Sequence, residues 1–254
     1  MTSDISHDRR IISQFTRWAA PFAALPVHAE ADGMTRTLSA IAARPGERVL
    51  DVACGPGIVA CALATEGARV TGIDLTPAMI LQAQQRQRQQ GLHGLDWQVG
   101  DATELPFVDG YFDRVVTRYS FHHLPEPIVA LREMRRVCRT GGRIVVIDAT
   151  PAADKQAAYD RMETLRDPSH TSALTLDQLR AMGRELGLSE AVVDFYPLEA
   201  QLGALADSED MAALEAMFDA DIASGEDRIG VGAWRAEDGI RFTFPVSIIA
   251  WQRD

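Results

Sequence analysis

Apolar residues follow two periodicities along this chain, and the change from one to the other marks the predicted elements. Short β-branched runs predict strands, and apolar positions three or four residues apart predict helices between them. The predicted strands are 48–54, 69–75, 96–102, 112–120, 143–148, 190–196 and 239–251. The predicted helices are 5–25, 34–43, 58–64, 77–90, 126–139, 176–186 and 207–223. Strands that alternate with helices from 48 to 148 indicate an α/β fold, a parallel sheet with helices on both faces.

A glycine-rich loop, Asp51-Val-Ala-Cys-Gly-Pro-Gly57, joins the first predicted strand to its helix. Gly55 and Gly57 permit positive φ and a close approach of the backbone, so N–H groups at the positive helix end can face a ligand. Such a loop is typical of sites for a nucleotide or a related molecule. The segment from Gly55 to Ala60 also fits the dinucleotide pattern G-x-G-x-x-G/A, which by itself does not identify the cofactor.

Asp51 discriminates between the two cofactors that fit this loop. Its carboxylate would repel a pyrophosphate, whereas it attracts the ammonium and sulfonium groups of S-adenosylmethionine. The order from Val49 to Gly57 resembles motif I of the class I methyltransferases, usually D-x-G-C-G-x-G. Ala53 stands where that family has its first glycine, and we expect this exchange to cost only a little room at the methionine end of the cofactor.

Two further acids end predicted strands. Asp74 lies 23 residues after Asp51, near the offset of about 20 residues at which an acid holds a ribose in this architecture. The alternative is a carboxylate that caps the next helix, but Thr76 is available as that cap. By resemblance, Asp101 accepts from the adenine amino group and the Ala102 N–H faces a ring nitrogen. Because parallel strands bind ligands at their carboxyl ends, we expect the three acids in one crevice.

Residues in and after the fourth predicted strand indicate which branch of this family the chain resembles. Phe112-Asp-x-Val and Ser120-Phe-His-His-Leu124 are similar to the quinone-methylating, small-molecule branch of the family, the type 11 group. The resemblance implies a Rossmann-like, doubly wound sheet of seven mostly parallel strands, with an antiparallel last strand beside the fifth. It also implies S-adenosyl-L-methionine as cofactor and S-adenosyl-L-homocysteine as product. The implied cofactor-binding residues are Asp51, Ala53, Gly55, Gly57, Asp74, Leu75, Met79, Asp101, Ala102 and Arg118.

Methyl transfer is an in-line displacement, so alignment of the reacting atoms in a dry cavity supplies most of the catalysis, and a strong base is optional. For a phenol or an acidic carbon the natural base is a histidine. The candidate catalytic residues are His123 and His170, although a structural bond to its own loop is an equal alternative for His123. The expected substrate pocket contains Phe15, Trp18, Phe22, Tyr119 and His122; for the first three the alternative is a helix packed on the sheet.

We expect a single methyltransferase domain over residues 1–254. Its core covers about 34–150 and 174–254, and its lid segments cover about 5–30, 150–172 and 199–227. Residues 199–227 carry nine acids and no Lys or Arg. An amphipathic helix with a solvated acidic face is favoured there over an electrostatic funnel for a cationic substrate.

The net charge of −11 opposes attraction to phosphate backbones and anionic lipids, so neither nucleic acid nor membrane is an expected partner. Cys54, Cys61 and Cys138 lie on predicted core elements and are expected to be reduced thiols. No metal site is predicted. Neither a signal peptide nor an apolar run of roughly 18 residues is visible. We therefore expect a cytoplasmic monomer or homodimer.

The sequence thus predicts a methyltransferase that acts on a small molecule, a quinone, a phenolic or heterocyclic metabolite or a natural product. An NAD-dependent oxidoreductase is disfavoured by Asp51 and Asp101. Two alternatives stay open: a relative that uses the bound cofactor for a non-transfer reaction such as cyclisation, and a protein that binds it only to sense it or to brace a partner. The sequence does not identify the acceptor or decide among C-, N- and O-methylation.

Overall fold

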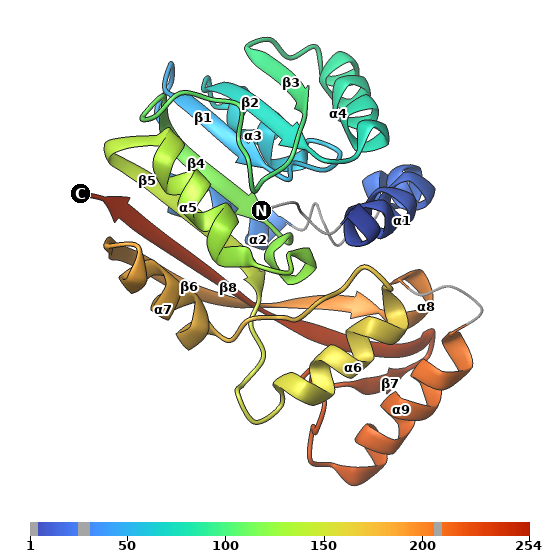
Figure 1. Ribbon diagram of the computed structural model, residues 1–254. Coiled ribbons are helices and arrows are strands. Elements are labelled where there is room, and N and C mark those ends of the chain that lie inside the picture. The colour runs from blue at the N-terminus through green and yellow to red at the C-terminus, as the bar shows by residue number, and fades with distance from the viewer. Residues whose placement is uncertain (1–4, 25–30, 206–209) are drawn as a thin grey trace.

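The computed structural model describes residues 5–24, 31–205 and 210–254 (Figure 1). The strands are β1 (Arg48–Val52), β2 (Arg69–Asp74), β3 (Leu95–Val99), β4 (Phe112–Arg118), β5 (Cys138–Ala149), β6 (Leu188–Gln201), β7 (Trp234–Ala236) and β8 (Gly239–Arg253). The helices are α1 (Ile5–Ala24), α2 (Ala31–Ile41), α3 (Ile58–Thr65), α4 (Pro77–Gln90), the 3-10 turn η2 (Phe121–His123), α5 (Pro127–Val137), α6 (Gln156–Arg166), α7 (Leu176–Glu185), α8 (Leu202–Leu205) and α9 (Met211–Ser224).

One sheet organises these elements in the order β3-β2-β1-β4-β5-β8-β6, and β7 pairs with β8. The pairs β1–β2, β1–β4, β2–β3 and β4–β5 are parallel, whereas β8 runs antiparallel between β5 and β6. This confirms the predicted Rossmann-like sheet and the antiparallel last strand beside the fifth. The three-residue strand β7 was not predicted, because it is too short to show a periodicity.

Alternating residues of the central strands build two separate cores, which is why helices cover both faces. Val116 and Val145 pack with α2 and α3 on one face. Their neighbours Val115 and Ile144 pack with α5 and α7 on the other face. All four side chains are fully buried, so β4 and β5 are apolar on both sides, as a strand covered by helices on each face requires.

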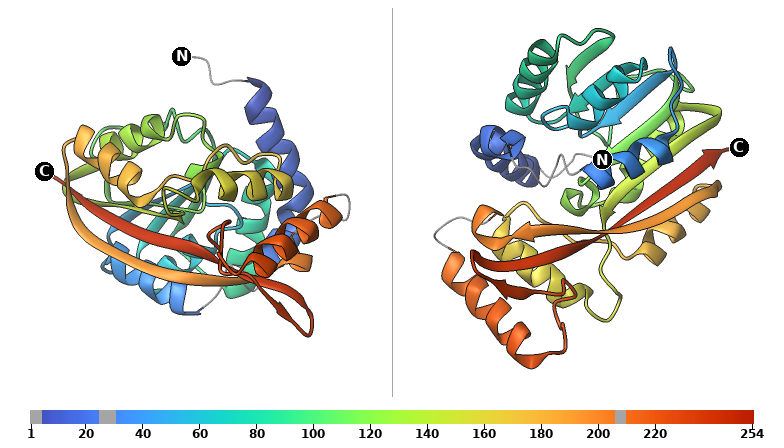
Figure 2. Two further views of the ribbon diagram at one scale, coloured as in Figure 1. Left: turned by 90° about the horizontal axis from the view of Figure 1, so that it is seen from below. Right: turned by 180° about the vertical axis from the view of Figure 1, so that it is seen from behind.

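A C-terminal lobe extends the sheet beyond these helices. We use this name for α6, α8, α9, β7 and the outer halves of β6 and β8, which share a third core around Tyr159, Phe218 and Phe242. Figure 2 shows β6 and β8 running together into this lobe. The prediction ended β6 at Tyr196, but the strand continues because Leu198 and the residues beyond it pair with the first half of β8.

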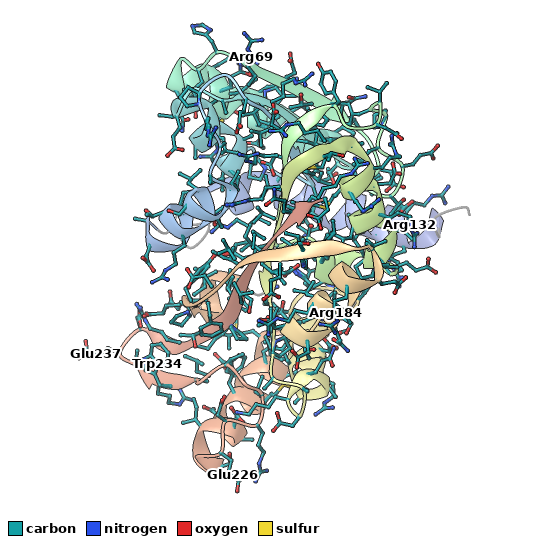
Figure 3. All side chains as sticks on the ribbon, turned by 90° about the vertical axis from the view of Figure 1, so that its left-hand side faces the viewer. Arg69, Arg132, Arg184, Glu226, Trp234 and Glu237 are labelled. Atoms are coloured by element: carbon teal, nitrogen blue, oxygen red, sulfur yellow. The ribbon has the colours of Figure 1, made fainter. Side chains whose placement is uncertain are left out.

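The acidic segment belongs to this lobe, and much of its charge is matched locally. On α9, Leu214 and Phe218 face the core, as the predicted amphipathic helix requires. In the described part of the segment, acids form the ion pairs Glu199–Arg241, Asp219–Arg235, Glu226–Arg228 and Asp227–Lys155. Glu226 lies at the end of the molecule opposite to Arg69 (Figure 3). Because bases offset these acids, the arrangement supports the solvated acidic face rather than an electrostatic funnel.

Candidate active site

A cavity of about 1000 Å³ lies at the carboxyl ends of the parallel strands. Its walls come from the loops that follow β1 to β4 and from one face of α1, which carries His7, Ile11 and Phe15. Helix α1 packs against α4 (Figure 1), so an N-terminal segment forms one wall of a cavity built mainly by the sheet. Among the described residues of the other two predicted lids, 150–172 and 199–227, none lines this cavity.

The three strand-end acids line this one cavity. Asp51 sits near the end of β1, Asp74 ends β2, and Asp101 follows β3. They converge because β1, β2 and β3 are adjacent and parallel, so their carboxyl ends share one edge. The expectation that these carboxylates meet in one crevice therefore agrees with the geometry.

The negative charge of the Asp51 carboxylate is energetically unfavourable in the protein without a ligand. It is only 2% exposed, and its Oδ2 has no hydrogen-bond partner among the residues that the structure describes. Burial, together with the charge of the nearby Asp74 carboxylate, raises the pKa of this carboxyl group to about 7. A backbone hydrogen bond from Ala60 and the charge of Arg118 act in the opposite direction. A cation placed beside Oδ2 would relieve this cost.

The loop after Asp51 has the glycine conformations that the sequence predicts. Gly55 and Gly57 have φ of 51° and 75°. A Cβ at Gly57 would lie 2.6 Å from the Trp97 ring, so glycine is needed for packing as well. At Gly55 a Cβ would meet no protein atom within 4 Å, which leaves room beside the backbone for a ligand.

The structure corrects the expectation that the methyl group of Ala53 only takes up a little room at the cofactor. Its φ is 52°, in the left-handed region that glycine adopts freely and that costs a residue with a Cβ roughly 1–2 kcal/mol. The residue therefore holds the cofactor loop in a strained backbone conformation. The family's glycine at this position removes a conformational cost rather than a steric one.

We expect Ala53→Gly to stabilise the protein. The relief of strain is offset in part by the larger entropy of glycine in the unfolded chain, which leaves a gain of about 0.5–1 kcal/mol. For a chain of this size the melting temperature should rise by about 1–4 °C. Ala43→Gly is the control, since Ala43 does not have a positive φ and should gain nothing. A lower melting temperature for Ala53→Gly would contradict the strain.

Asp74 ties the cofactor loop to the start of α4. Its Oδ2 accepts from the Gly55 N–H and its Oδ1 from the Thr76 N–H, each at 2.8 Å. Thr76 occupies the N-cap position, but its side chain makes no capping hydrogen bond. The expectation that Thr76 caps the helix and leaves Asp74 free is therefore wrong: both Asp74 oxygens already hold the backbone. Each oxygen keeps a second lone pair that can accept from a ligand.

The remaining residues predicted for the cofactor lie around the same cavity. Ala53, Leu75, Met79, Ala102 and Arg118 all line it. Asp101 accepts from the Thr103 N–H at 2.8 Å, which orients its carboxylate.

Arg118 and Tyr119 form a polar wall of the cavity. The Arg118 guanidinium donates to Tyr119 Oη at 3.1 Å and lies 4.5 Å from the centre of its ring. Tyr119 Oη in turn lies 2.6 Å from Tyr196 Oη on β6. Tyr119 has a φ of 59°, an unusual conformation for a bulky residue, and such strain is common at functional sites.

The charges in the cavity fit S-adenosylmethionine rather than a dinucleotide. An ammonium group would supply the hydrogen bonds that Asp51 Oδ2 lacks among the described residues. The open space at Gly55 admits a ligand against the backbone. A pyrophosphate would instead meet the carboxylates of Asp51 and Asp74.

The candidate histidines have different surroundings. His123 lines the cavity, and its ring and that of Phe15 are nearly perpendicular, with 5.0 Å between ring centres. Its Nδ1 lies 3.2 Å from both the backbone oxygen and Oγ of Ser169, while its own carbonyl accepts from His7 Nε2 at 2.7 Å. His123 therefore joins α1, the turn after β4 and the loop after α6, which agrees with the structural alternative for this residue and leaves a catalytic role untested.

His122 is held by a buried carboxylate and is not among the residues that line this cavity. Its Nδ1 lies 2.6 Å from Asp148 Oδ1, and the N–H groups of Phe121 and His122 donate to Asp148 Oδ2. The negative charge of Asp148 outweighs the effect of burial and raises the pKa of His122. Asp148 is the penultimate residue of β5, which pairs with β4, and His122 follows β4, so the sheet brings the two residues together.

His170 is buried between α6 and the turn after β4, and it is also absent from the lining of this cavity. Its Nε2 donates to Asp160 Oδ1 at 2.8 Å. Asp160 also accepts from the Ala173 N–H and the Ser172 hydroxyl. Thr171, the next residue, donates from its N–H to the His122 carbonyl at 2.8 Å, so this loop is fastened to the site.

Replacing His170 by alanine is expected to lower the free energy of unfolding by about 2–3 kcal/mol, because a buried, charge-assisted hydrogen bond is lost. Affinity for S-adenosylhomocysteine should change less than about twofold, since the side chain does not line the cavity. Denaturant unfolding and calorimetric titration measure the two effects, with His93→Ala at an exposed histidine as control. A large loss of cofactor affinity would place His170 in the cofactor site.

Several lining residues escaped the sequence analysis. His7, Asp8 and Ile11 of α1 line the cavity, and the spacing of His7, Ile11 and Phe15 on one helix face was the signal available for them. The predicted pocket residues Trp18 and Phe22 lie outside the described side chains. Within the part of the chain that is described, no helix has the length and apolar character that a bilayer crossing requires.

Comparison with known proteins agrees with the resemblance to methyltransferases that the sequence motifs indicate. A methyltransferase-domain family model matches residues 50–146. The demethylmenaquinone methyltransferase of Beutenbergia cavernae is 40% identical over 125 residues, which are 48% of this chain and 50% of that protein. The uncharacterized methyltransferase YcgJ of Bacillus subtilis is 31% identical over 158 residues, 61% of this chain and 62% of that protein. The chain thus spans only 50% and 62% of the lengths of these curated relatives.

The crystal structure of YcgJ shares the fold, with a TM-score of 0.79 and 24% identity over 88% of this chain and 99% of that one. The family match covers β1 to β5, the part of the sheet whose loops form most of the cavity. Residues 50–146 therefore match a methyltransferase domain in sequence, and the chain has the fold of YcgJ.

Proposed function

We propose that this protein transfers the methyl group of S-adenosylmethionine to a small-molecule acceptor. The observation that carries the proposal is the single cavity in which Asp51, the glycine loop, Asp74 and Asp101 meet. This set offers carboxylates for an ammonium group and for hydroxyl groups, and open backbone between them. The bound cofactor would supply an electrophilic methyl group on a sulfonium centre.

The chain's own residues would bind and orient the cofactor in this cavity. We assign the ammonium group to Asp51, the ribose hydroxyls to Asp74, and the adenine edge to Asp101 and the Ala102 N–H. Arg118 would face the carboxylate. Leu75 and Met79 supply apolar contacts near Asp74.

Helix α1 and the turn after β4 would exclude water and position the acceptor. Ile11, Phe15, Phe121 and Leu124 form an apolar wall, which favours a largely apolar acceptor. Such a cavity accelerates transfer chiefly by alignment and desolvation. Similarity to a demethylmenaquinone methyltransferase supports a quinone-like or phenolic acceptor, with a heterocyclic natural product in the same class.

Of the two candidate catalytic residues, His123 lines the described cavity and His170 supports the loop beside it. We propose that the described elements work as one methyltransferase domain in which α1 acts as a lid. The segment 150–172 would then brace the turn after β4 through Ser169 and Thr171.

Thermal unfolding with added ligands tests the proposal. S-adenosylhomocysteine at a hundredfold excess over its dissociation constant should stabilise the protein by about 2.7 kcal/mol, a rise in melting temperature of about 5–10 °C. NAD should leave the melting temperature unchanged. A rise with NAD and none with S-adenosylhomocysteine would overturn the proposal.

A further inference from the structure

His123 stands out because one side of its ring is fixed by the protein while the residue lines the cavity. Nδ1 lies 3.2 Å from the carbonyl oxygen of Ser169 and 3.2 Å from its hydroxyl oxygen. No hydrogen bond to Nε2 is found among the described residues. The ring is thus anchored through Nδ1, and Nε2 is the nitrogen left for a ligand.

The partners of Nδ1 determine which nitrogen carries the proton. The Ser169 hydroxyl donates to Asp167 Oδ1 at 2.6 Å, so its oxygen is left to accept from His123. The Ser169 carbonyl can only accept. Both partners therefore require a proton on Nδ1, and in the neutral ring this leaves Nε2 as a bare acceptor.

The neighbouring groups keep this ring neutral. The His122 ring lies 4.1 Å away between centres and has the carboxylate of Asp148 as its partner, whereas His123 has only neutral partners on Nδ1. Burial and the charge of His122 lower the pKa of His123 to about 3, against the opposing effects of Asp167 and Asp148. His7 of α1 contacts the His123 carbonyl rather than its ring. At neutral pH His123 therefore offers a lone pair and no charge.

We propose that His123 Nε2 accepts a hydrogen bond from the hydroxyl group of an aromatic methyl acceptor and so selects hydroxylated rings over analogues that lack the donor. The inference rests on the proposed function and names its substrate class. Phe15, whose ring is perpendicular to that of His123, and the apolar wall around it suit a flat ring. The selection is strong because an acceptor buried without its partner loses binding energy that an O–H would recover.

A matched pair of fluorescent probes tests this recognition. 2-Naphthol carries the donor, whereas 2-methoxynaphthalene has the same ring and cannot donate. In fluorescence titrations of the full chain loaded with S-adenosylhomocysteine, we expect naphthol to bind about tenfold more tightly than the ether. His123→Phe should reduce this ratio to less than about twofold. His93→Phe, the same change at an exposed histidine, should keep it.

A second measurement uses the wild-type protein and therefore tests the role of His123 even if His123→Phe does not fold. In protein with 15N-labelled histidine at pH 7, His123 should appear as the neutral ring protonated at Nδ1, and naphthol but not the ether should shift its Nε2 signal. Equal binding of the two probes, an Nε2-protonated ring or an imidazolium would overturn the inference. The same probe titrations without S-adenosylhomocysteine separate the two proposals. If S-adenosylhomocysteine does not bind, the proposed function is wrong. The ratio of the naphthol and ether affinities in the protein alone still tests the role of His123.

Discussion

Replacing Asp74 by alanine is expected to weaken S-adenosylhomocysteine binding by about thirtyfold to a thousandfold and to lower the free energy of unfolding at the same time. The affinity loss corresponds to about 2–4 kcal/mol for two charge-assisted hydrogen bonds from the ribose hydroxyls, with water partly replacing the acceptor. The stability loss follows from the bonds already present: without the carboxylate, the N–H groups of Gly55 and Thr76 lose their partner. We expect this second loss to be about 2–4 kcal/mol.

Asp74→Asn separates the two roles. An amide has one oxygen, so it can accept from either Gly55 or Thr76, and its NH2 group would face the other N–H. Stability should therefore fall nearly as far as in the alanine variant, whereas the remaining oxygen can still accept one bond from the ribose. Calorimetric titration and denaturant unfolding of both variants measure these effects, with Asp96→Ala on the exposed part of β3 as control. Unchanged affinity in Asp74→Ala would refute the ribose role.

The core of the fold was predictable because its signals are local. Short apolar runs mark β1, β4 and the second half of β5, and Pro77 and Gly91 mark the ends of α4 in the sequence as in the structure. The C-terminal lobe was less predictable. The extension of β6 depends on pairing with a strand some 40 residues away, and no local pattern encodes that partner.

The same distinction holds for the site. The three acids were predictable because they end strands of one parallel sheet, and the sheet brings strand ends together. Their partners were not. Whether Asp74 binds backbone depends on how the Gly55 loop folds back, and the pairing of His122 with Asp148 crosses from one strand to the next. The strain at Ala53 was likewise invisible, since sequence shows a methyl group but not a φ angle.

Asp51 gives the prediction with the widest consequences. Its negative charge destabilises the protein without ligand, and in the proposed function the same charge binds the ammonium group of the cofactor. The pKa of its carboxyl group is about 7 in the folded protein and about 3.9 in an unfolded chain. Between these values the folded state binds the proton and the unfolded state does not. Stability should therefore fall as the pH rises from about 4 to about 7, and the loss should be complete above about 7.

Asp51→Asn removes this titration while keeping the shape of the side chain. At 1.36 kcal/mol for each pKa unit, the wild type loses about 4 kcal/mol of stability between pH 4 and pH 7. The variant avoids this loss, but its buried amide NH2 group in place of Oδ2 lowers its own stability by part of that amount. We expect the variant to be about 2–4 kcal/mol more stable than the wild type at pH 8 and no more stable at pH 4. Denaturant unfolding without ligand at pH 4, 6 and 8 measures this, with Asp96→Asn as control.

The same substitution should weaken the cofactor site. Loss of the charge-assisted bond to the ammonium group should reduce affinity for S-adenosylmethionine by about tenfold to a hundredfold at pH 8. Because a cation favours the charged carboxylate, wild-type affinity should rise with pH up to about 7, whereas that of the variant should stay flat in the same range. If the wild type became more stable relative to Asp51→Asn between pH 4 and 8, the charged Asp51 carboxylate would not be destabilising. If both proteins bound S-adenosylmethionine with equal affinity, Asp51 would not belong to the cofactor site. The expected pair of outcomes, a more stable protein that binds its cofactor less well, follows from a carboxylate buried to meet a ligand rather than to support the fold.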